Sequence, residues 1–67
     1  MKNSLKVERA RKNISQAELA NRVNVSRLTI HSIETGKFNP SVQLALKIAR
    51  YFEIKVEELF ILDDEDQ

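Results

Sequence analysis

The chain reads SQAELANRVNVSRLTIHSIETG from Ser15 to Gly36, and this pattern predicts two short helices joined by a tight bend. Ser15 is placed to cap the first helix, and Glu18 three residues later completes a capping box. Ser26 is placed to cap the second helix, which we expect over about residues 26–35 because a glycine follows. Apolar residues recur at helical spacing, so each helix is predicted to bury one face and leave the other outward.

Further helices are predicted on both sides of this pair. A first helix should run from a cap at Ser4 to about Asn13, and its expected inward residues are Leu5, Val7 and Ala10. A short loop, a fourth helix and a fifth short helix should follow the central pair. The expected bounds are residues 37–40 for the loop, Ser41 for the cap of the fourth helix and about residues 55–61 for the fifth helix. The sequence therefore predicts an all-α, compact five-helix fold.

Length and composition indicate one small domain. A chain of 67 residues buries only about 60% of the surface that its unfolded form exposes. We place the domain at residues 1–62. Residues 63–67, DDEDQ, are expected to form a frayed acidic tail, because acids at the negative end of a helix disfavour further helix.

The residue types argue against several classes of function. The chain has no cysteine and a single histidine, His31, so we expect no disulfide, no metal site and no cofactor. Without a second histidine or a glycine-rich phosphate loop, the sequence does not indicate an enzyme. It has no apolar run of roughly 20 residues and no signal peptide, so we expect a cytoplasmic protein with no membrane contact.

Charge is distributed unevenly along the chain. Residues 1–50 hold ten Lys and Arg and three acids, a net charge of +7, whereas residues 51–67 hold one Lys and seven acids, a net charge of −6. A basic body favours a polyanion such as nucleic acid as its partner. A solvated surface whose charges happen to be sorted is the alternative, and charge alone does not separate the two.

The outward face of the second helix of the pair has the composition that major-groove recognition requires. At about 100° per residue, Ile30 and Ile33 define the buried direction, and the opposite face is short, polar and free of acids. Base edges are read by Arg gripping guanine, by hydroxyls, and by apolar groups against the thymine methyl. The predicted base-reading residues are Arg27, Leu28, His31 and Ser32.

A second set of residues is placed to hold the phosphate backbone. The first N–H groups of both helices lack an internal partner and favour a phosphate. Side chains in the first turns and in the loop after the second helix could add donors without reading sequence. The predicted phosphate contacts are Gln16, Ser26, Thr29, Lys37 and Asn39.

These residues carry a resemblance to a known family. The segment Gln16–Thr35 resembles the helix-turn-helix of the phage Cro and lambda-repressor-like transcriptional regulators. The likeness continues through further short runs, so that it covers about residues 5–62. These runs are Ile33-Glu34-Thr35-Gly36-Lys37, Asn39-Pro40-Ser41, Leu44-Ala45-Leu46-Lys47-Ile48-Ala49 and Glu57-Glu58-Leu59-Phe60.

The resemblance implies a five-helix lambda-repressor-like fold, dimeric binding to operator DNA, and a role as repressor or activator. It also implies that Arg9 pairs with Glu34 and ties the first helix to the recognition helix. Two positions depart from the family pattern. Asn24 replaces the usual glycine of the bend, where Asn tolerates a left-handed backbone, and Glu8 stands where relatives usually have Leu or Ile.

The number of contacts favours a homodimer. One recognition helix makes too few contacts to stand out from bulk genomic DNA at physiological salt. Two copies about 34 Å apart would read successive major grooves of a pseudo-palindromic operator. We place the dimer interface at the C-terminal end, with the acidic tails outside it. The predicted interface residues are Phe60, Ile61 and Leu62.

Other interpretations remain open at this point. Arg27 could be a phosphate contact or a free surface residue, and Leu28 could be an ordinary exposed leucine or a protein contact. The three C-terminal apolar residues could close the core. As a whole, the chain could be a protein-interaction module, such as an antitoxin, that uses its acidic C-terminal end.

Overall fold

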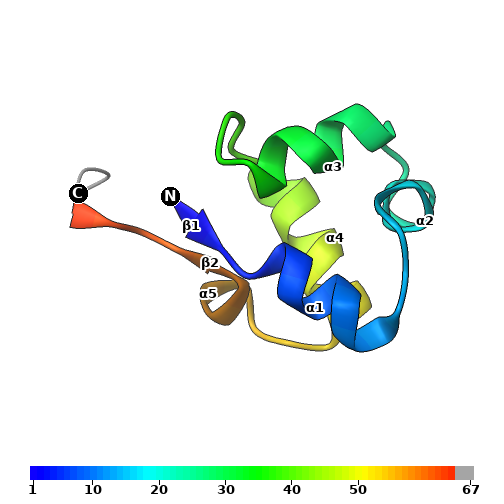
Figure 1. Cartoon of the computed structure of the whole chain (residues 1–67). Helices are drawn as coiled ribbons and strands as arrows, with labels where there is room; N and C mark the ends of the chain where they lie inside the picture. The colour runs from blue at the N-terminus through cyan, green and yellow to red at the C-terminus, as the bar shows by residue number, and fades with distance from the viewer. Residues whose placement is uncertain (65–67) are drawn as a thin grey trace.

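The structure is a computed structural model that describes residues 1–64, and residues 65–67 of the expected acidic tail lie outside that range (Figure 1). Its helices surround one core, and two short strands bring the two ends of the described chain together. The helices are α1 (Leu5–Lys12), α2 (Gln16–Arg22), α3 (Arg27–Glu34), α4 (Val42–Phe52) and α5 (Val56–Leu59), and the strands are β1 (Lys2–Asn3) and β2 (Phe60–Ile61).

Three serines begin helices as predicted. The hydroxyl oxygen of Ser15 accepts a hydrogen bond from the backbone N–H of Glu18 at 3.0 Å. Ser26 and Ser41 cap α3 and α4 in the same way, each at 3.1 Å. Between α2 and α3, Asn24 has a φ of 62°, which is the left-handed conformation expected for the bend. These local interactions fix where the helices begin and where the chain bends between α2 and α3.

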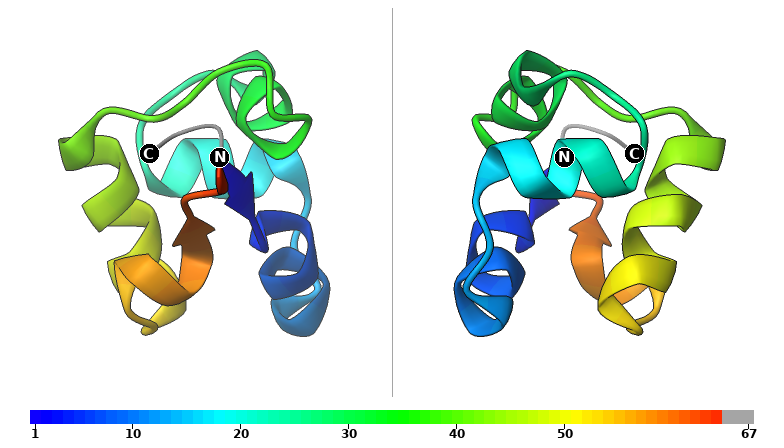
Figure 2. Two further views of the ribbon diagram at one scale, coloured as in Figure 1. Left: turned by 90° about the vertical axis from the view of Figure 1, so that its left-hand side faces the viewer. Right: turned by 90° about the vertical axis from the view of Figure 1, so that its right-hand side faces the viewer.

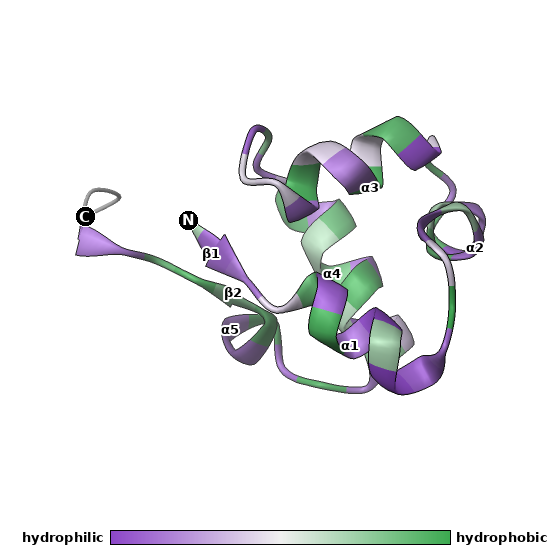
Figure 3. Ribbon diagram, in the orientation of Figure 1, coloured by the Kyte–Doolittle hydropathy of each residue, from purple (hydrophilic) through white to green (hydrophobic). Residues whose placement is uncertain are grey.

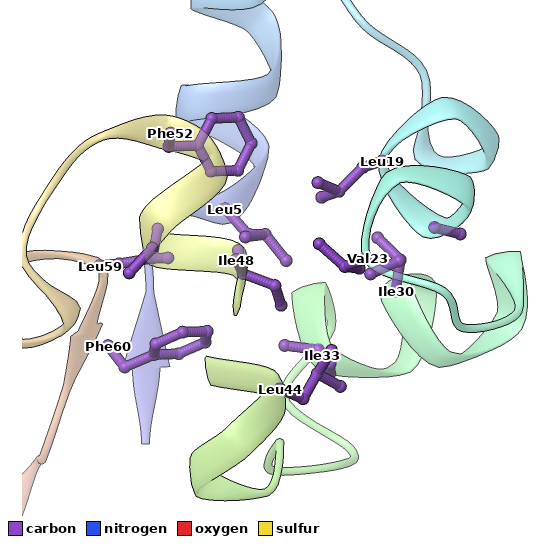
Figure 4. Packing of buried hydrophobic residues seen from close by; sticks show 12 residues of the cluster. Leu5, Leu19, Val23, Ile30, Ile33, Leu44, Ile48, Phe52, Leu59 and Phe60 are labelled. Atoms are coloured by element: carbon purple, nitrogen blue, oxygen red, sulfur yellow. The ribbon is translucent and has the colours of Figure 1, made fainter. Parts of the chain in front are cut away.

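One hydrophobic core joins all the helices (Figure 4). Apolar and polar residues are interspersed along the helices (Figure 3), and all five helices of the described chain contribute buried apolar side chains to the core. Burying each large aliphatic side chain contributes about 1.5–3 kcal/mol. The buried residues are Leu5, Leu19, Ala20, Val23, Ile30, Ile33, Leu44, Ile48, Ala49, Phe52, Leu59 and Phe60.

Helix α1 differs from the prediction in its inward face. Leu5 is its only buried residue, whereas Val7 and Ala10 are exposed. At about 100° per residue, Val7 lies roughly 200° around the helix from Leu5, so both cannot face the core. Glu8 lies three residues after Leu5 on the partly buried side, and its carboxylate is 3.4 Å from Arg11 Nη1. The polar residue at this family position is therefore accommodated by a neighbouring charge.

The five predicted helices are all present, and the ends of the described chain add two short strands that the sequence did not predict. The fifth helix stops at Leu59 rather than about residue 61, and strand β2 pairs antiparallel with β1, with Asn3 opposite Phe60 (Figure 2). The N–H of Ser4 extends this pairing by donating to the carbonyl of Leu59 at 3.0 Å. Ser4 stands at the N-cap of α1, but the side-chain cap comes from Asn3, whose Oδ1 accepts from the N–H of Leu5 at 3.2 Å.

Within residues 1–64, no helix has the length and apolar character needed to cross a bilayer. The same residues contain no cluster of three or more His, Cys, Asp or Glu side chains arranged to share a metal ion.

Candidate nucleic-acid interface

Helix α3 has one buried face and one open face. Ile30 and Ile33 are essentially fully buried, and α3 packs against α2. On the opposite side, Leu28 is 65% exposed, and Arg27 and His31 are exposed as well. Ser32 and Thr29 are partly buried and border this face. The fold therefore brings the four predicted base-reading residues to one side of α3.

A hydrogen-bond network connects this helix to α1. Arg9 donates from Nε to Oε2 of Glu34 at 2.5 Å and from Nη2 to Oε1 at 3.1 Å. It also donates from Nη1 to the carbonyl of Ile14 at 2.9 Å. The structure thus contains the ion pair that the family resemblance implied. One guanidinium therefore links α1, the turn before α2 and the end of α3.

The environment of the pair sets its charge state. Burial raises the pKa of Glu34, but hydrogen bonds from Arg9 and Gln16 and the positive charges of Arg9 and Lys6 outweigh burial and lower that pKa below its ordinary value. The hydrogen bond with Glu34 raises the pKa of Arg9. Both side chains are therefore ionised together at neutral pH.

Gln16 extends the network to the open face. Its Nε2 donates to Oε1 of Glu34 at 3.0 Å, and its Oε1 accepts from Nη1 of Arg27 at 3.2 Å. A carboxylate only accepts hydrogen bonds, so the amide of Gln16 is oriented with Nε2 toward Glu34. Nδ1 of His31 lies 3.4 Å from the same Nε2. The sequence did not foretell this arrangement, in which Gln16 steadies Arg27 instead of projecting freely.

The remaining predicted phosphate contacts lie at the two ends of α3. At its start, the hydroxyls of Ser26 and Thr29 are 2.9 Å apart. After its end, Lys37 and Asn39 are exposed in the loop. The structure thus places polar groups on both sides of the open face, about one helix length apart.

Phe38 is a residue of this surface that the sequence analysis missed. It lies between Lys37 and Asn39 and is 49% exposed. Its ring lines a shallow hollow together with Leu28, Thr29 and Ser32. An aromatic residue inside an otherwise polar loop was the available signal.

The predicted C-terminal interface needs one correction. Phe60 is only 8% exposed and belongs to the core of the monomer, whereas Ile61 and Leu62 are exposed. Successive residues of a strand point to opposite sides, so Phe60 packs inward as Ile61 faces out. The interpretation of these residues as core closure holds for Phe60, and two apolar side chains remain on the surface.

Comparisons with known proteins agree with this geometry. The Helix-turn-helix family model matches residues 5–59. The chain is 50% identical over 66 residues to an HTH-type transcriptional regulator of Methanocaldococcus jannaschii, covering 98% of this chain and 100% of that protein. It is 52% identical to an HTH-type transcriptional regulator of Archaeoglobus fulgidus, covering 98% of this chain and 93% of the relative.

A solved structure is similar over most of the fold. The crystal structure of the restriction-modification controller protein C.AhdI from Aeromonas hydrophila matches with a TM-score of 0.76 and 34% sequence identity. The match covers 84% of this chain and 85% of the controller protein.

Proposed function

The chain belongs to the helix-turn-helix family of Cro and lambda-repressor-like transcriptional regulators, and from this premise we propose that it binds one double-stranded operator sequence as a homodimer. Helix α3 enters the major groove, and occupancy of the operator represses transcription. Such a protein works in the cytoplasm, on the chromosome. The observation that carries the proposal is the open face of α3, where Arg27, Leu28 and His31 are exposed together over a buried isoleucine pair.

The chemistry of this face supports reading of base edges. Arg27 can grip the O6 and N7 atoms of guanine bidentately, and Ser32 and His31 can exchange hydrogen bonds with base edges. Leu28 offers an apolar contact. Glu34 is the acid closest in sequence to this face, and its charge is compensated by Arg9. A polyanion therefore meets no uncompensated acid on α3.

The residues at the ends of α3 support binding of the two flanking backbones. Lys37 and Asn39 would hold the phosphates on one side of the groove, and Ser26 and Thr29 those on the other. Gln16 is proposed to contact a phosphate as well, but its Nε2 already donates to Glu34. Its second amide hydrogen can reach a phosphate once Nε2 gives up its 3.4 Å contact with Nδ1 of His31.

Homodimerisation is proposed because a monomer presents a single recognition helix. Two copies reading half-sites about 34 Å apart gain the affinity that one copy lacks. The exposed side chains of Ile61, in β2, and of Leu62, which follows it, are the surface that we propose for this contact. A bound dimer would occupy DNA that RNA polymerase needs, which is the simplest route to repression.

Substitution of Arg27 tests the proposal. Arg27→Ala should weaken binding to the preferred operator by about 1–3 kcal/mol and relax specificity at one base pair. Arg50→Ala is the matched control, because Arg50 is an exposed arginine beside the hollow between α4 and α5. Fluorescence anisotropy with labelled operator and with unrelated duplexes measures both. Equal loss by Arg27→Ala on every duplex would make Arg27 a phosphate contact.

A second candidate function rests on the C-terminal end. The exposed Ile61 and Leu62 lie beside acidic residues, in a region whose net charge is −6. This surface suits a basic protein partner, as in an antitoxin. An interaction module alone would bind duplex DNA no better than an uncharged protein, so salt-sensitive retention on random genomic fragments discriminates the two.

A further inference from the structure

The open face of α3 contains an apolar recess, and one of its lining residues, Phe38, has no part yet in the proposed function. It is lined by two apolar side chains, Leu28 of α3 and Phe38 of the following loop, and by Thr29 and Ser32. Leu28 and Phe38 are both largely exposed. Large apolar side chains on an otherwise polar surface mark sites where a ligand or partner is bound.

Backbone hydrogen bonds fix Phe38 relative to α3. The N–H groups of Lys37 and Phe38 both donate to the carbonyl of Ser32, at 2.9 and 3.2 Å. The chain turns back on the helix at Gly36, whose φ of 79° suits glycine. These backbone hydrogen bonds hold the loop that carries Phe38 against the helix that carries Leu28.

The surroundings of the recess identify the kind of occupant. None of the four lining residues is charged, and the exposed cations Arg27 and Lys37 precede Leu28 and Phe38 in the chain. This arrangement matches a polyanion that carries a small apolar group. The major groove of DNA offers such a group in only one position, the C5-methyl of thymine.

We propose that the recess between Leu28 and Phe38 binds the C5-methyl group of a pyrimidine in the major groove. The inference rests on the proposed function and makes Phe38 a specificity-determining residue supplied by the loop after the recognition helix. Thymine carries this methyl group in ordinary DNA, and 5-methylcytosine carries the same group in methylated DNA. The recess would thus make the protein sensitive to a single methyl on a base that it does not need to contact by hydrogen bonds.

Replacement of single thymines by deoxyuridine tests this directly. The probe is the operator enriched by the wild-type protein from a random duplex pool, with one thymine exchanged per duplex. Uracil pairs as thymine does and lacks only the methyl group. At one position per half-site, the exchange should lower the affinity of the protein for the duplex about fourfold, which is the effect of losing the burial of one methyl-sized group. Exchanges at the other positions should change the affinity little.

Variants assign the effect to the recess. Phe38→Ala should bind the thymine and deoxyuridine operators with nearly equal affinity, whereas Phe38→Leu should keep part of the difference. Val42→Ala is the control, since Val42 is an exposed apolar residue on another helix and its loss should leave the fourfold difference intact. Thermal melting checks that each variant is folded.

A pair of duplexes with cytosine or 5-methylcytosine at the sensitive position distinguishes the sources of the methyl group. Tighter binding of the methylated duplex indicates that the recess accepts either base, and equal binding restricts it to thymine. The inference is overturned if no deoxyuridine exchange weakens wild-type binding, or if Phe38→Ala retains the full difference. A protein that binds no duplex at all would overturn the proposed function too, and that outcome is visible before any thymine is exchanged.

Discussion

Arg9 on α1 and Glu34 at the end of α3 are joined by two hydrogen bonds, from Nε to Oε2 at 2.5 Å and from Nη2 to Oε1 at 3.1 Å. The carboxylate is only 5% exposed. It also accepts from Gln16, which in turn accepts from Arg27. An unbroken chain of polar contacts therefore runs from the first helix to the first turn of the recognition helix.

Arg9→Ala should lower the free energy of unfolding by about 2–4 kcal/mol, because it leaves a buried carboxylate without its charged partner. Arg11→Ala is the matched control. Arg11 is largely exposed and makes only a 3.4 Å contact with Glu8, so its loss should cost under about 1 kcal/mol. Urea denaturation followed by circular dichroism measures both. Equal losses would mean that Arg9 and Glu34 do not hold the helices together.

Glu34 should make the protein lose stability in acid. Its pKa is lowered in the folded protein, so the unfolded chain takes up a proton at a higher pH than the folded chain does. The stabilisation is complete above the unfolded pKa, and it is lost as pH falls through the folded pKa. Glu34→Gln should therefore be less stable than the wild type at neutral pH, and the difference should shrink below about pH 4. If the two proteins differ in unfolding free energy by the same amount from about pH 3 to about pH 7, Glu34 is not part of an ionised pair.

Sequence patterns predicted the central part of this fold because its signals are local. Ser15, Ser26 and Ser41 each accept a hydrogen bond within three residues, and Asn24 is a residue type that tolerates the positive φ of the bend. The open face of α3 followed from the spacing of two isoleucines. Such features depend on residues that are close in the sequence, so they can be predicted from the sequence alone.

The parts that were missed depend on contacts between distant residues. Strand β2 forms because Phe60 pairs with Asn3. These two residues are more than fifty positions apart in the sequence. The two-residue strand β1 gives no periodic signal of its own. Phe38 joins the open face only because its loop is hydrogen bonded to Ser32. The orientation of Gln16 in α2 likewise depends on its hydrogen bond to Glu34 in α3.

Leu5 should be the main anchor of α1. Leu5→Ala removes a fully buried side chain and should lower the free energy of unfolding by about 2–5 kcal/mol. Val7→Ala, in the same helix, removes an exposed side chain and should change it by under about 0.5 kcal/mol. Denaturant titration of the two variants checks the assignment. A large loss for Val7→Ala would instead indicate that Val7 is covered, for example by a second copy of the chain.

Lys37 should contribute to DNA affinity without reading sequence. Lys37→Ala should weaken binding to all duplexes alike and reduce the slope of log affinity against log salt by about one unit, because one fewer counterion is released. Lys47→Ala serves as the control, since Lys47 is an exposed lysine on α4 and should leave the slope unchanged. Salt titrations of operator binding give both slopes. If Lys37→Ala keeps the wild-type slope, the loop lies outside the DNA footprint.

Selection of duplexes from a random pool by the wild-type protein, followed by sequencing, tests most directly whether α3 reads the major groove. We expect enrichment of one motif made of two inverted half-sites, whose centres are about 10 base pairs apart. Arg27→Ala should lose the preference for one base pair in each half-site while keeping the same spacing. A pool whose composition stays unchanged after selection at low salt would contradict the account.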